Sequence, residues 1–379
     1  MEYRYKKIAE LGKIITGKTP PTENEAFFGG NYPFITPSDI CSYDEKYLVD
    51  TERSISSLGS RKLKGMLLPK GSICFVCIGS TIGKMCMTNK ESYTNQQINS
   101  IIPNREYDNN YLFYYLRHIK GYFQSIGAGT GSGKGIINKT LFSKTKICVL
   151  EDKDCQKKIA SILSAYDNLI ENNNKRIKIL EQMAENLYKE WFVRFRFPDH
   201  EVIPFENGIP KGWSEEKLSV VFEVKYGKDH KNIEDGLIPI FGSGGIMRYG
   251  NKALCSEEAV LIPRKGSLNN VMYYKGDFWT VDTMFYTKMK IKHCAKYTYF
   301  TLSKVDLEGL NSGASIPSMT TDILYHLKMI VPDESTLIAF DKQIDALFAE
   351  KDHLEIQNQN LIKQRDLLLP RLMSGKLKV

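Results

Sequence analysis

The stretch that decides the fold is residues 159–191, IASILSAYDNLIENNNKRIKILEQMAENLYKEW. Its core-type positions recur at alternating steps of four and three residues, which is the heptad pattern of a helix that packs lengthwise against another helix. The same alternation returns in residues 340–372, so the two seams are expected to pair with each other. The seam positions are Ile159, Leu163, Tyr166, Ile170, Asn173, Ile177, Leu180, Ala184, Leu187 and Trp191 in the first stretch, and Phe340, Ile344, Leu347, Lys351, Leu354, Asn358, Leu361, Arg365, Leu368 and Leu372 in the second.

Polar residues inside the seams indicate the direction of pairing. An asparagine in such a seam destabilises it unless a partner amide is present, but it fixes the register. An antiparallel pair with matched ends places Asn173 opposite Asn358, whereas a parallel pair places Asn173 opposite Leu354. We therefore predict an antiparallel pair. Each helix would span about 50 Å at 1.5 Å per residue, with the segments that precede the helices at opposite ends of this spacer.

The rest of the chain is duplicated around these helices. The sequence KICVLE at 146–151 matches KMIVPD at 328–333, GAG at 127–129 resembles GAS at 313–315, and YKKI at 5–8 resembles WSEEKL at 213–218. The predicted fold class is α+β, with two pseudo-symmetric mixed α/β domains separated by two long antiparallel coiled-coil helices. The predicted boundaries are 1–150 for the first domain, 151–197 for the first helix, 198–212 for a Pro- and Gly-rich linker, 213–332 for the second domain and 333–379 for the second helix.

Local patterns refine this picture. Residues 107–123 carry apolar side chains at helical spacing and are predicted to form one helix, and residues 66–76 are typical of a strand, a turn and a second strand. Residues 259–267 repeat that turn in the second half, and Gly375 is expected to end the second helix.

Composition bounds the class of protein. The chain has 379 residues, of which 42% are hydrophobic and 25% charged, which is normal for a globular protein of two or more domains. It has no apolar run long enough to cross a membrane, and its first residues lack a signal peptide, so we expect it in the cytoplasm without membrane contact. Cys74 and Cys77 lie in the apolar run ICFVCI without a second ligand pair, which favours buried thiols over a zinc site.

The positive charge is concentrated in the first domain. The net charge is +8, and residues 1–150 contain 20 Lys and Arg against 12 Asp and Glu. The remaining segments are close to neutral. A basic domain attracts polyanions such as nucleic acid, although charge alone also fits an ordinary solvated surface.

A set of motifs, in order along nearly the whole chain, resembles one known family. The first half contains TGKTP at 16–20 and YPFITPSDI at 32–40, and the second half contains IPIFGSGGI at 238–246, VLIPRKGS at 260–267 and FWTVD at 278–282. The helix ends are EWFV at 190–193 and LLPRLMSGKL at 368–377. Together they resemble the specificity subunits of type I restriction–modification systems, in which the two domains are target-recognition domains and the helices are spacers.

The resemblance implies a role and a set of partners. Each target-recognition domain would read one half of an interrupted double-stranded DNA sequence, and the paired helices would set the spacing and dock two methyltransferase subunits. Restriction subunits, which are translocases, would join that complex. The chemistry, S-adenosylmethionine and ATP would belong to those partners, so this chain is expected to contain no catalytic residue, cofactor or metal of its own.

Base reading requires polar side chains that reach base edges, together with Lys and Arg that hold phosphate. Glutamine suits adenine and arginine suits guanine, because each can form two hydrogen bonds with that base. Residues of these types in predicted loops are the candidates for DNA contact, although each can equally be an ordinary surface residue. They are Thr36, Ser38, Lys84, Gln96, Gln97, Lys134, Arg248, Arg264, Lys265 and Ser267.

Three catalytic patterns are incomplete. AGTGSGKG at 128–135 resembles a P-loop, but both ends of the motif fail, so a connecting loop or a loop that contacts DNA phosphate through Lys134 fits better. The catalytic tetrapeptide of amino-methyltransferases is absent. The carboxylates of 198–199 and 215–216 flank a linker rather than adjacent strands, which disfavours a nuclease. A stand-alone metal-dependent nuclease and a coiled-coil scaffold without DNA binding remain the alternatives.

Overall fold

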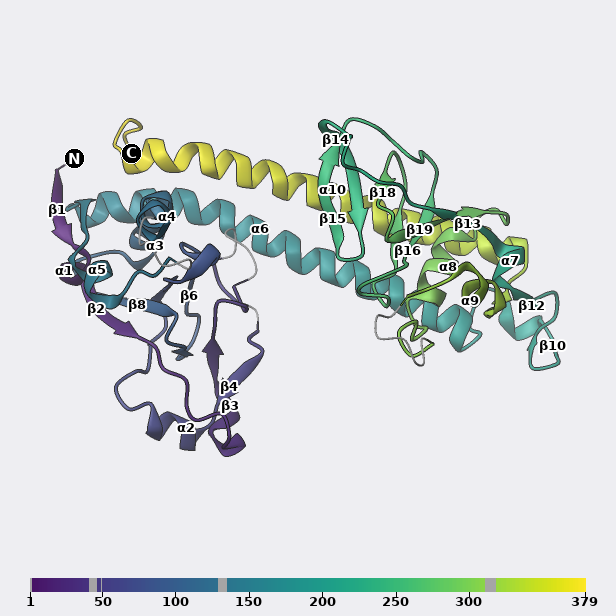
Figure 1. Ribbon diagram of the computed structural model, residues 1–379, viewed down its shortest axis with the longest axis horizontal. Helices are drawn as coiled ribbons and strands as arrows, with labels where there is room; N and C mark the ends of the chain where they lie inside the picture. The colour runs from purple at the N-terminus through teal and green to yellow at the C-terminus, as the bar shows by residue number, and fades with distance from the viewer. Residues whose placement is uncertain (1, 41–45, 49, 129–134, 311–317) are drawn as a thin grey trace. The chain divides into compact units, whose positions relative to one another are not determined.

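The computed structural model describes residues 2–40, 46–48, 50–128, 135–310 and 318–379 (Figure 1). The chain divides into two compact units, and the boundary between them falls within both long helices. Unit 1 comprises Met1–Lys175 with Leu354–Val379, and unit 2 comprises Arg176–His353. Each unit therefore contains one globular portion and a stretch of both helices.

The two long helices are α6, Lys153–Tyr188, and α10, Glu334–Met373. A π-helical turn, Lys189–Val193, follows α6. Equivalent aspartates cap their first turns: Asp152 accepts from the Cys155 N–H and Asp333 from the Thr336 N–H, each three residues on. Gly375 adopts a φ of 70° just beyond α10, which is the left-handed conformation predicted for a glycine stop.

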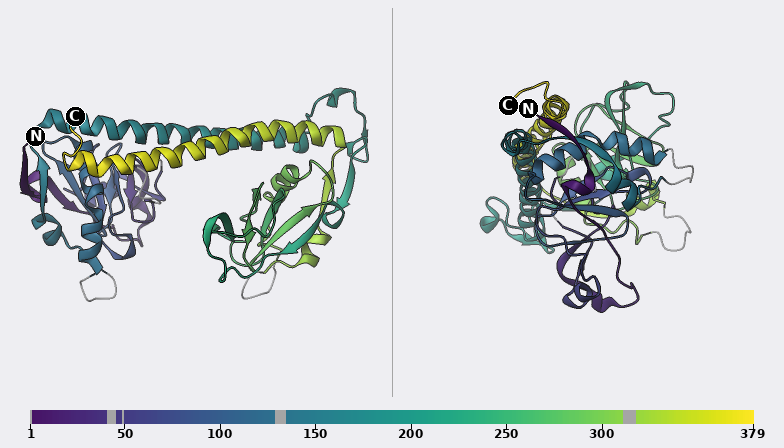
Figure 2. Two further views of the ribbon diagram at one scale, coloured as in Figure 1. Left: turned by 90° about the horizontal axis from the view of Figure 1, so that it is seen from above. Right: turned by 90° about the vertical axis from the view of Figure 1, so that its left-hand side faces the viewer.

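In unit 1 the two helices pair in antiparallel fashion (Figure 2). The Asn173 Nδ2 donates to Asn358 Oδ1 at 3.0 Å and to Gln357 Oε1 at 2.7 Å. Further along the seam, Arg365 Nη1 lies 2.7 Å from Asp167 Oδ1, and both side chains are buried. The partner's residue number on α10 rises as the residue number on α6 falls, as an antiparallel register requires.

Unit 2 continues the same register. The rings of Trp191 and Phe340 lie 5.8 Å apart, and Lys351 Nζ lies 2.7 Å from Glu181 Oε1. The predicted class, mixed α/β domains with an antiparallel pair of long helices, is therefore confirmed.

The globular portion of unit 1 contains two sheets and a peripheral strand pair. The first sheet has the order β2-β8-β5-β6, the second has the order β4-β3-β7, and β1 pairs with β9. The strands are β1 Tyr3–Lys7, β2 Gly12–Thr16, β3 Phe28–Ile35, β4 Arg53–Ile55, β5 Ile73–Val76, β6 Met85–Met87, β7 Tyr93–Thr94, β8 Ile98–Pro103 and β9 Lys146–Leu150. The helices are α1 Ile8–Leu11, α2 Ser57–Lys62, α3 Asn109–His118, α4 Lys120–Ala128 and α5 Lys139–Lys144, with 3-10 turns η1 Glu25–Phe27 and η2 Gly79–Thr81.

Unit 2 repeats this topology strand for strand. Its sheets have the orders β13-β19-β16-β17 and β15-β14-β18, and β12 pairs with β20. The strands are β12 Ser214–Lys217, β13 Phe222–Tyr226, β14 Asp235–Gly242, β15 Gly245–Gly250, β16 Ala259–Pro263, β17 Met272–Tyr274, β18 Trp279–Thr280, β19 Met284–Met289 and β20 Lys328–Val331. The helices are α7 Leu218–Val221, α8 Ala295–Leu302 and α9 Thr321–His326. A 3-10 turn η4, His200–Val202, and a short hairpin, β10 Phe205–Glu206 and β11 Ile209–Pro210, precede them.

Two glycines show how closely the repeats correspond. The Gly17 N–H donates to the Ile98 carbonyl, and the Gly227 N–H donates to the Met284 carbonyl. A Cβ at Gly17 would lie 2.3 Å from the Asn95 carbonyl oxygen, and one at Gly227 would lie 1.9 Å from the corresponding oxygen of Val281. Glycine is required at both positions because the backbones approach so closely.

The prediction of a single helix over residues 107–123 is wrong, because the structure has two helices there. Helix α3 ends at His118 and α4 begins at Lys120, with a turn at Ile119 between them. The apolar spacing continues through the turn because both helices pack on the same core, in which Leu112, Leu116 and Phe123 are all buried.

The cores are apolar, and two cysteines of unit 1 lie inside them. Cys74 and Cys77 are buried, unpaired cysteines of β5 and the residue after it, and burial raises the pKa of the Cys77 thiol to about 12. Within the described ranges, no helix combines the length and hydropathy that a membrane span needs.

Candidate nucleic-acid interface

The candidate interface of unit 1 begins where β3 ends. The Thr36 N–H and hydroxyl donate to Asp39 Oδ2 at 2.7 Å and 2.6 Å, and Ser38 Oγ lies 2.8 Å from Thr36 Oγ1. Asp39 Oδ1 in turn accepts from the Glu52 N–H at 2.7 Å. These bonds hold the chain in a tight turn and present two hydroxyl groups beside the sheet.

The next element of this interface is a pair of amides that follows β7. Asn95 is buried, and its Nδ2 donates to Gln97 Oε1 at 3.1 Å while its Oδ1 accepts from the Gln97 N–H at 3.0 Å. Gln96 is exposed and accepts from the Thr19 hydroxyl at 2.8 Å. The buried asparagine therefore fixes the carboxamide of Gln97, which is what bidentate reading of adenine requires.

Three of the predicted residues line one groove with an arginine that the sequence had not suggested. Thr36, Ser38 and Gln97 line it together with Arg53, the first residue of β4. Arg53 is exposed, and its guanidinium lies 5.6 Å from the centre of the Phe28 ring. A guanidinium supported on one face by an aromatic ring presents its N–H edge to a ligand.

The two units place an arginine at the same point of the fold. Arg53 pairs across the strands with Phe34, which in turn pairs with Tyr93. In unit 2 Arg248 pairs across the strands with Ile240, which pairs with Trp279. Arg248 was among the predicted residues, whereas Arg53 was missed.

Arg248 is more firmly held than Arg53. Its Nη2 donates to the carbonyls of His230 at 2.5 Å and Ile233 at 2.8 Å, and its Nη1 lies 3.3 Å from Asp235 Oδ1. The guanidinium thus braces the loop that precedes β14. Contact with a base would use only the part of its N–H edge that these carbonyls leave accessible.

The other predicted residues of unit 2 lie in the loop after β16. The N–H groups of Arg264 and Lys265 both point to the Thr283 carbonyl, at 2.8 Å and 3.2 Å. The Arg264 guanidinium lies 5.6 Å from the Tyr226 ring, while Lys265 and Ser267 are exposed. This loop presents two cations and a hydroxyl to solvent.

Gly266 gives that loop its shape and has a counterpart in unit 1. Its φ is 86°, and Gly79, at the same position after β5, has a φ of 66°. Ser80 and Ser267 follow these glycines. The shared Gly-Ser pair after a buried strand is a signal that could have added Ser80 to the candidates.

The β14–β15 turn lies against this loop. The Asn270 Nδ2 donates to the Ser243 carbonyl at 2.8 Å, and a Cβ on Gly266 would lie 2.7 Å from Ser243 Oγ. The structure thereby brings the loop with Arg264, Lys265 and Ser267 next to the hairpin that carries Arg248.

Two predicted residues do not join these groups. Lys84 is half-buried at the turn before β6, where its carbonyl accepts from the Val76 N–H at 2.9 Å. It does not line the groove of Thr36, Ser38 and Gln97. Lys134 lies outside the described residues.

The carboxylates that could have formed a nuclease site lie in different parts of unit 2. Glu215 Oε2 lies 2.6 Å from Lys328 Nζ across the β12–β20 pair. Asp199 lies in the turn before η4 with a φ of 62°. Among the residues whose placement is described, no group of three or more His, Cys, Asp and Glu side chains is arranged to hold a metal ion.

The fold thus defines a class of protein. The chain has two α/β units of the same topology, and each unit contains polar loops beside its sheets and a stretch of both antiparallel helices. Residues 1–182 and 210–364 match the family model described as the type I restriction modification DNA specificity domain. The chain belongs to this family, and it is a specificity subunit of the type I class whose established role is recognition of a DNA target.

Relatives and a solved structure agree with this placement. The chain is 26% identical over 412 residues to the type I restriction enzyme MjaIX specificity subunit of Methanocaldococcus jannaschii, an alignment that covers 100% of this chain and 94% of the relative. It is 35% identical over 177 residues to the HindI specificity subunit of Haemophilus influenzae, which covers 45% of this chain and 38% of that one. Its fold is similar to the crystal structure of a type I restriction–modification S subunit from M. genitalium, with a TM-score of 0.62, 18% identity and coverage of 98% and 96%.

Proposed function

We propose that each unit reads one part of an interrupted DNA target, and that the chain assembles with methyltransferase and restriction subunits that carry out the chemistry. The observation that supports this most is the duplication: both units repeat the same strand order and register, with an arginine at the same point of an edge strand. Two equal reading modules in one chain fit a target with two specified parts.

Unit 1 offers the clearer reading surface. Arg53 can donate two hydrogen bonds to guanine O6 and N7, and Gln97 can pair with adenine N6 and N7. Thr36 and Ser38 supply hydroxyl groups beside them. In unit 2 the loop of Arg264, Lys265 and Ser267 would hold phosphate and position the hairpin of Arg248 against the bases.

The helices would dock the partner subunits. In unit 1, the apolar side chains of Ile162 and Leu169 of α6 are exposed, and their spacing of seven residues places both on one face of the helix. In unit 2, Ile179 and Met183 of the same helix are exposed four residues apart. Apolar side chains at helical spacing suit a partner helix that lies alongside α6.

In this proposal S-adenosylmethionine and ATP are bound by the partners, and the chain itself performs no catalytic step. Two methyltransferase subunits, one for each unit, suit the duplication.

The test is a map of methylated adenines in a genome whose methyltransferase genes are intact. We expect an interrupted motif that disappears when this chain is deleted and returns when it is restored. An Arg53→Ala variant should weaken discrimination at one base pair of one half-site by about 1–3 kcal/mol, and Arg53→Lys should not restore it because lysine lacks the bidentate fork.

The matched control is Arg61→Ala, which removes an exposed arginine of α2 that does not line the groove. It should leave the motif unchanged. A motif that is insensitive to Arg53→Ala, or methylation that persists without the chain, would contradict the proposal.

A further inference from the structure

The two units differ at the outer edge of their four-stranded sheets. In unit 1 the edge strand β6 is covered: the Met87 N–H donates to the Lys46 carbonyl at 2.7 Å, and Tyr47 forms a parallel bridge with Met87. In unit 2 the corresponding edge strand is β17, where Tyr273 pairs with Val260 as Met87 pairs with Ile73. Among the described residues of unit 2, no segment pairs with the outer side of β17.

The segment that covers β6 also places the ammonium group of Lys46 against helix α6. The Lys46 ammonium donates to Ser164 Oγ of α6 at 2.9 Å, and it lies 5.0 Å and 5.9 Å from the ring centres of Tyr114 and Phe113. Burial lowers the pKa of Lys46 to about 8, against the opposing influence of Asp167, so this enclosed site is less favourable to the cation than water is.

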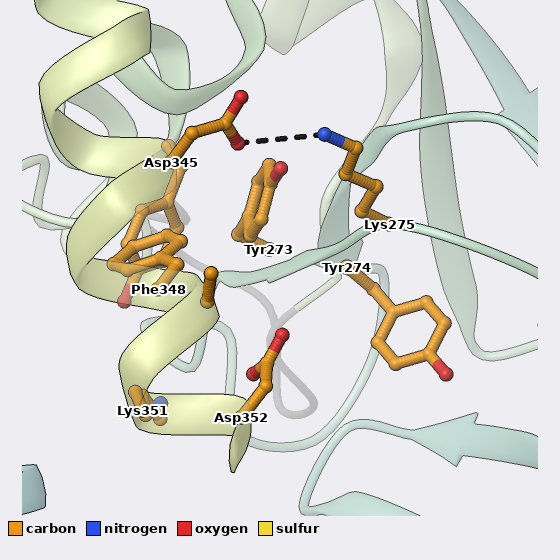
Figure 3. Close-up of a pocket in the computed structure, with 9 residues that line it drawn as sticks. Tyr273, Tyr274, Lys275, Asp345, Phe348, Lys351 and Asp352 are labelled. Atoms are coloured by element: carbon orange, nitrogen blue, oxygen red, sulfur yellow. Dashed lines mark hydrogen bonds and ion pairs between the residues drawn. The ribbon is translucent and has the colours of Figure 1, made fainter.

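At the uncovered edge, unit 2 has an open pocket (Figure 3). It lies between β17 and α10, and aromatic rings form much of its wall: the Tyr273 and Phe348 ring centres are 5.4 Å apart, and those of Tyr273 and Tyr299 are 6.1 Å apart. In the figure, Asp352 projects from α10 into the space between Phe348 and Tyr274.

The charges of the pocket are unevenly compensated. Lys296 is buried and pairs with Asp345 of the pocket wall at 2.9 Å, as well as with Glu258 at 2.8 Å and Asp341 at 2.6 Å. Asp345 also lies 3.4 Å from Lys275, so its charge is matched. Asp352 lies seven residues further along α10, beyond these cations.

The surroundings of Asp352 favour an incoming cation. Lys351 is directed to Glu181 of α6, at 2.7 Å, and burial raises the pKa of Asp352 against the influence of Lys351. A carboxylate beside aromatic faces is the usual setting for an ammonium or guanidinium group. Residues 334–355 also contain six acidic side chains against two basic ones, which favours a basic partner.

We propose that an extended segment of a protein partner adds to the edge of β17, as the segment of Lys46 and Tyr47 does to β6, and places a lysine or arginine against Asp352. The backbone of the added strand supplies affinity, and the pocket selects the basic side chain. This inference rests on the proposed assembly with protein partners and assigns one of their contact points.

The experiment uses the full chain and a peptide that carries fluorescein on its N-terminal amine, fluorescein-Gly-Ser-Lys-Tyr-Leu-Ser-Gly-amide, which keeps the residue order of 46–48 and leaves the lysine free. Anisotropy is measured for this peptide and for one with norleucine in place of lysine, while N-acetyl-lysine amide serves as an unlabelled competitor. The protein variants are Asp352→Asn and, as the matched control, Glu171→Gln. Glu171 holds the position of Asp352 on α6, beside the edge that is already covered, and circular dichroism verifies that both variants fold.

We expect saturable binding of the lysine peptide at one site, about tenfold weaker for the norleucine peptide and for Asp352→Asn, and unchanged for Glu171→Gln. Equal binding of the norleucine peptide, no effect of Asp352→Asn, or no binding at all would overturn the proposal. Competition by N-acetyl-lysine amide as strong as by the unlabelled peptide would show that no strand is added, and would also overturn it. The assay contains neither DNA nor a methyltransferase, so its failure leaves the DNA-reading proposal to be judged by the methylation map.

Discussion

The buried ion pair between the helices in unit 1 gives a prediction whose size follows from the structure. Arg365 has 0% exposed side chain and lies 2.7 Å from Asp167, whose exposure is 5%. Replacing Arg365 by Met leaves a buried carboxylate without its main cation, a change that costs about 3–5 kcal/mol. Asp167 keeps the hydrogen bond from the Tyr114 hydroxyl at 2.5 Å, so we expect the lower end, about 3 kcal/mol. For a unit of this size, the midpoint of thermal unfolding should fall by about 6–12 °C.

The assay compares two signals, because all three tryptophans, Trp191, Trp213 and Trp279, belong to unit 2. Far-ultraviolet circular dichroism follows both units, whereas tryptophan fluorescence follows unit 2. Arg365→Met should therefore lower the dichroism midpoint by more than the fluorescence midpoint.

A double-mutant cycle isolates the pair. The double variant Asp167→Met with Arg365→Met should regain most of the lost stability, giving a coupling energy of about 2 kcal/mol or more. The control is Arg176→Met, which breaks an exposed interhelical pair with Glu350 and should cost less than about 1 kcal/mol. Additive single effects at Asp167 and Arg365 would refute the pairing and, with it, the antiparallel register in this unit.

Two further predictions concern other polar groups of the helices. Asn173→Leu should destabilise the chain by about 1–3 kcal/mol because the Asn358 Oδ1 loses its donor, while the Asn358 Nδ2 still donates to Asn174. Asn173→Leu combined with Asn358→Leu should be more stable than either single variant but should broaden the distances between spin labels on the two helices; a double variant as unstable as the singles would contradict this. Burial alone would raise the pKa of Asp333, but hydrogen bonds from Ser335, Thr336 and Trp213 outweigh it and hold the pKa at about 2, below the ordinary 3.8. The folded-state pKa is thus depressed, so this carboxylate adds stability above about pH 4 that is lost as the pH falls toward 2. The difference in free energy of unfolding between the wild type and Asp333→Asn, measured by urea titration, should shrink from pH 5 to pH 2.5, and a constant difference would refute it.

The pairing of the helices could be predicted from sequence because it depends on the heptad spacing of residues that are close together in the chain. The seam positions of residues 159–191 and 340–372 fix which faces meet, and an unmatched Asn173 excludes the parallel alternative. The contact of Asn173 with Asn358 requires only that geometry. The duplication was visible for the same reason, since short matching strands such as β9 and β20 keep their apolar pattern.

The grooves could not be predicted in this way. Arg53 and Arg248 correspond only through their cross-strand partners, Phe34 and Ile240. The chain between β3 and β4 runs from 36 to 52, whereas β14 and β15 are joined by a tight turn at 243–244, so no constant offset in sequence aligns them. Tertiary pairing sets that register. The same holds for Lys296, whose buried ammonium pairs with carboxylates from two distant parts of unit 2, Glu258 and helix α10.

The most direct test of the central claim is a methylation map for a chimaera in which residues 1–150 are replaced by the equivalent domain of a relative with a different target. The account predicts that one half of the interrupted motif changes while the other half and its methylation persist. A motif changed in both halves would contradict the claim that the two units read DNA independently.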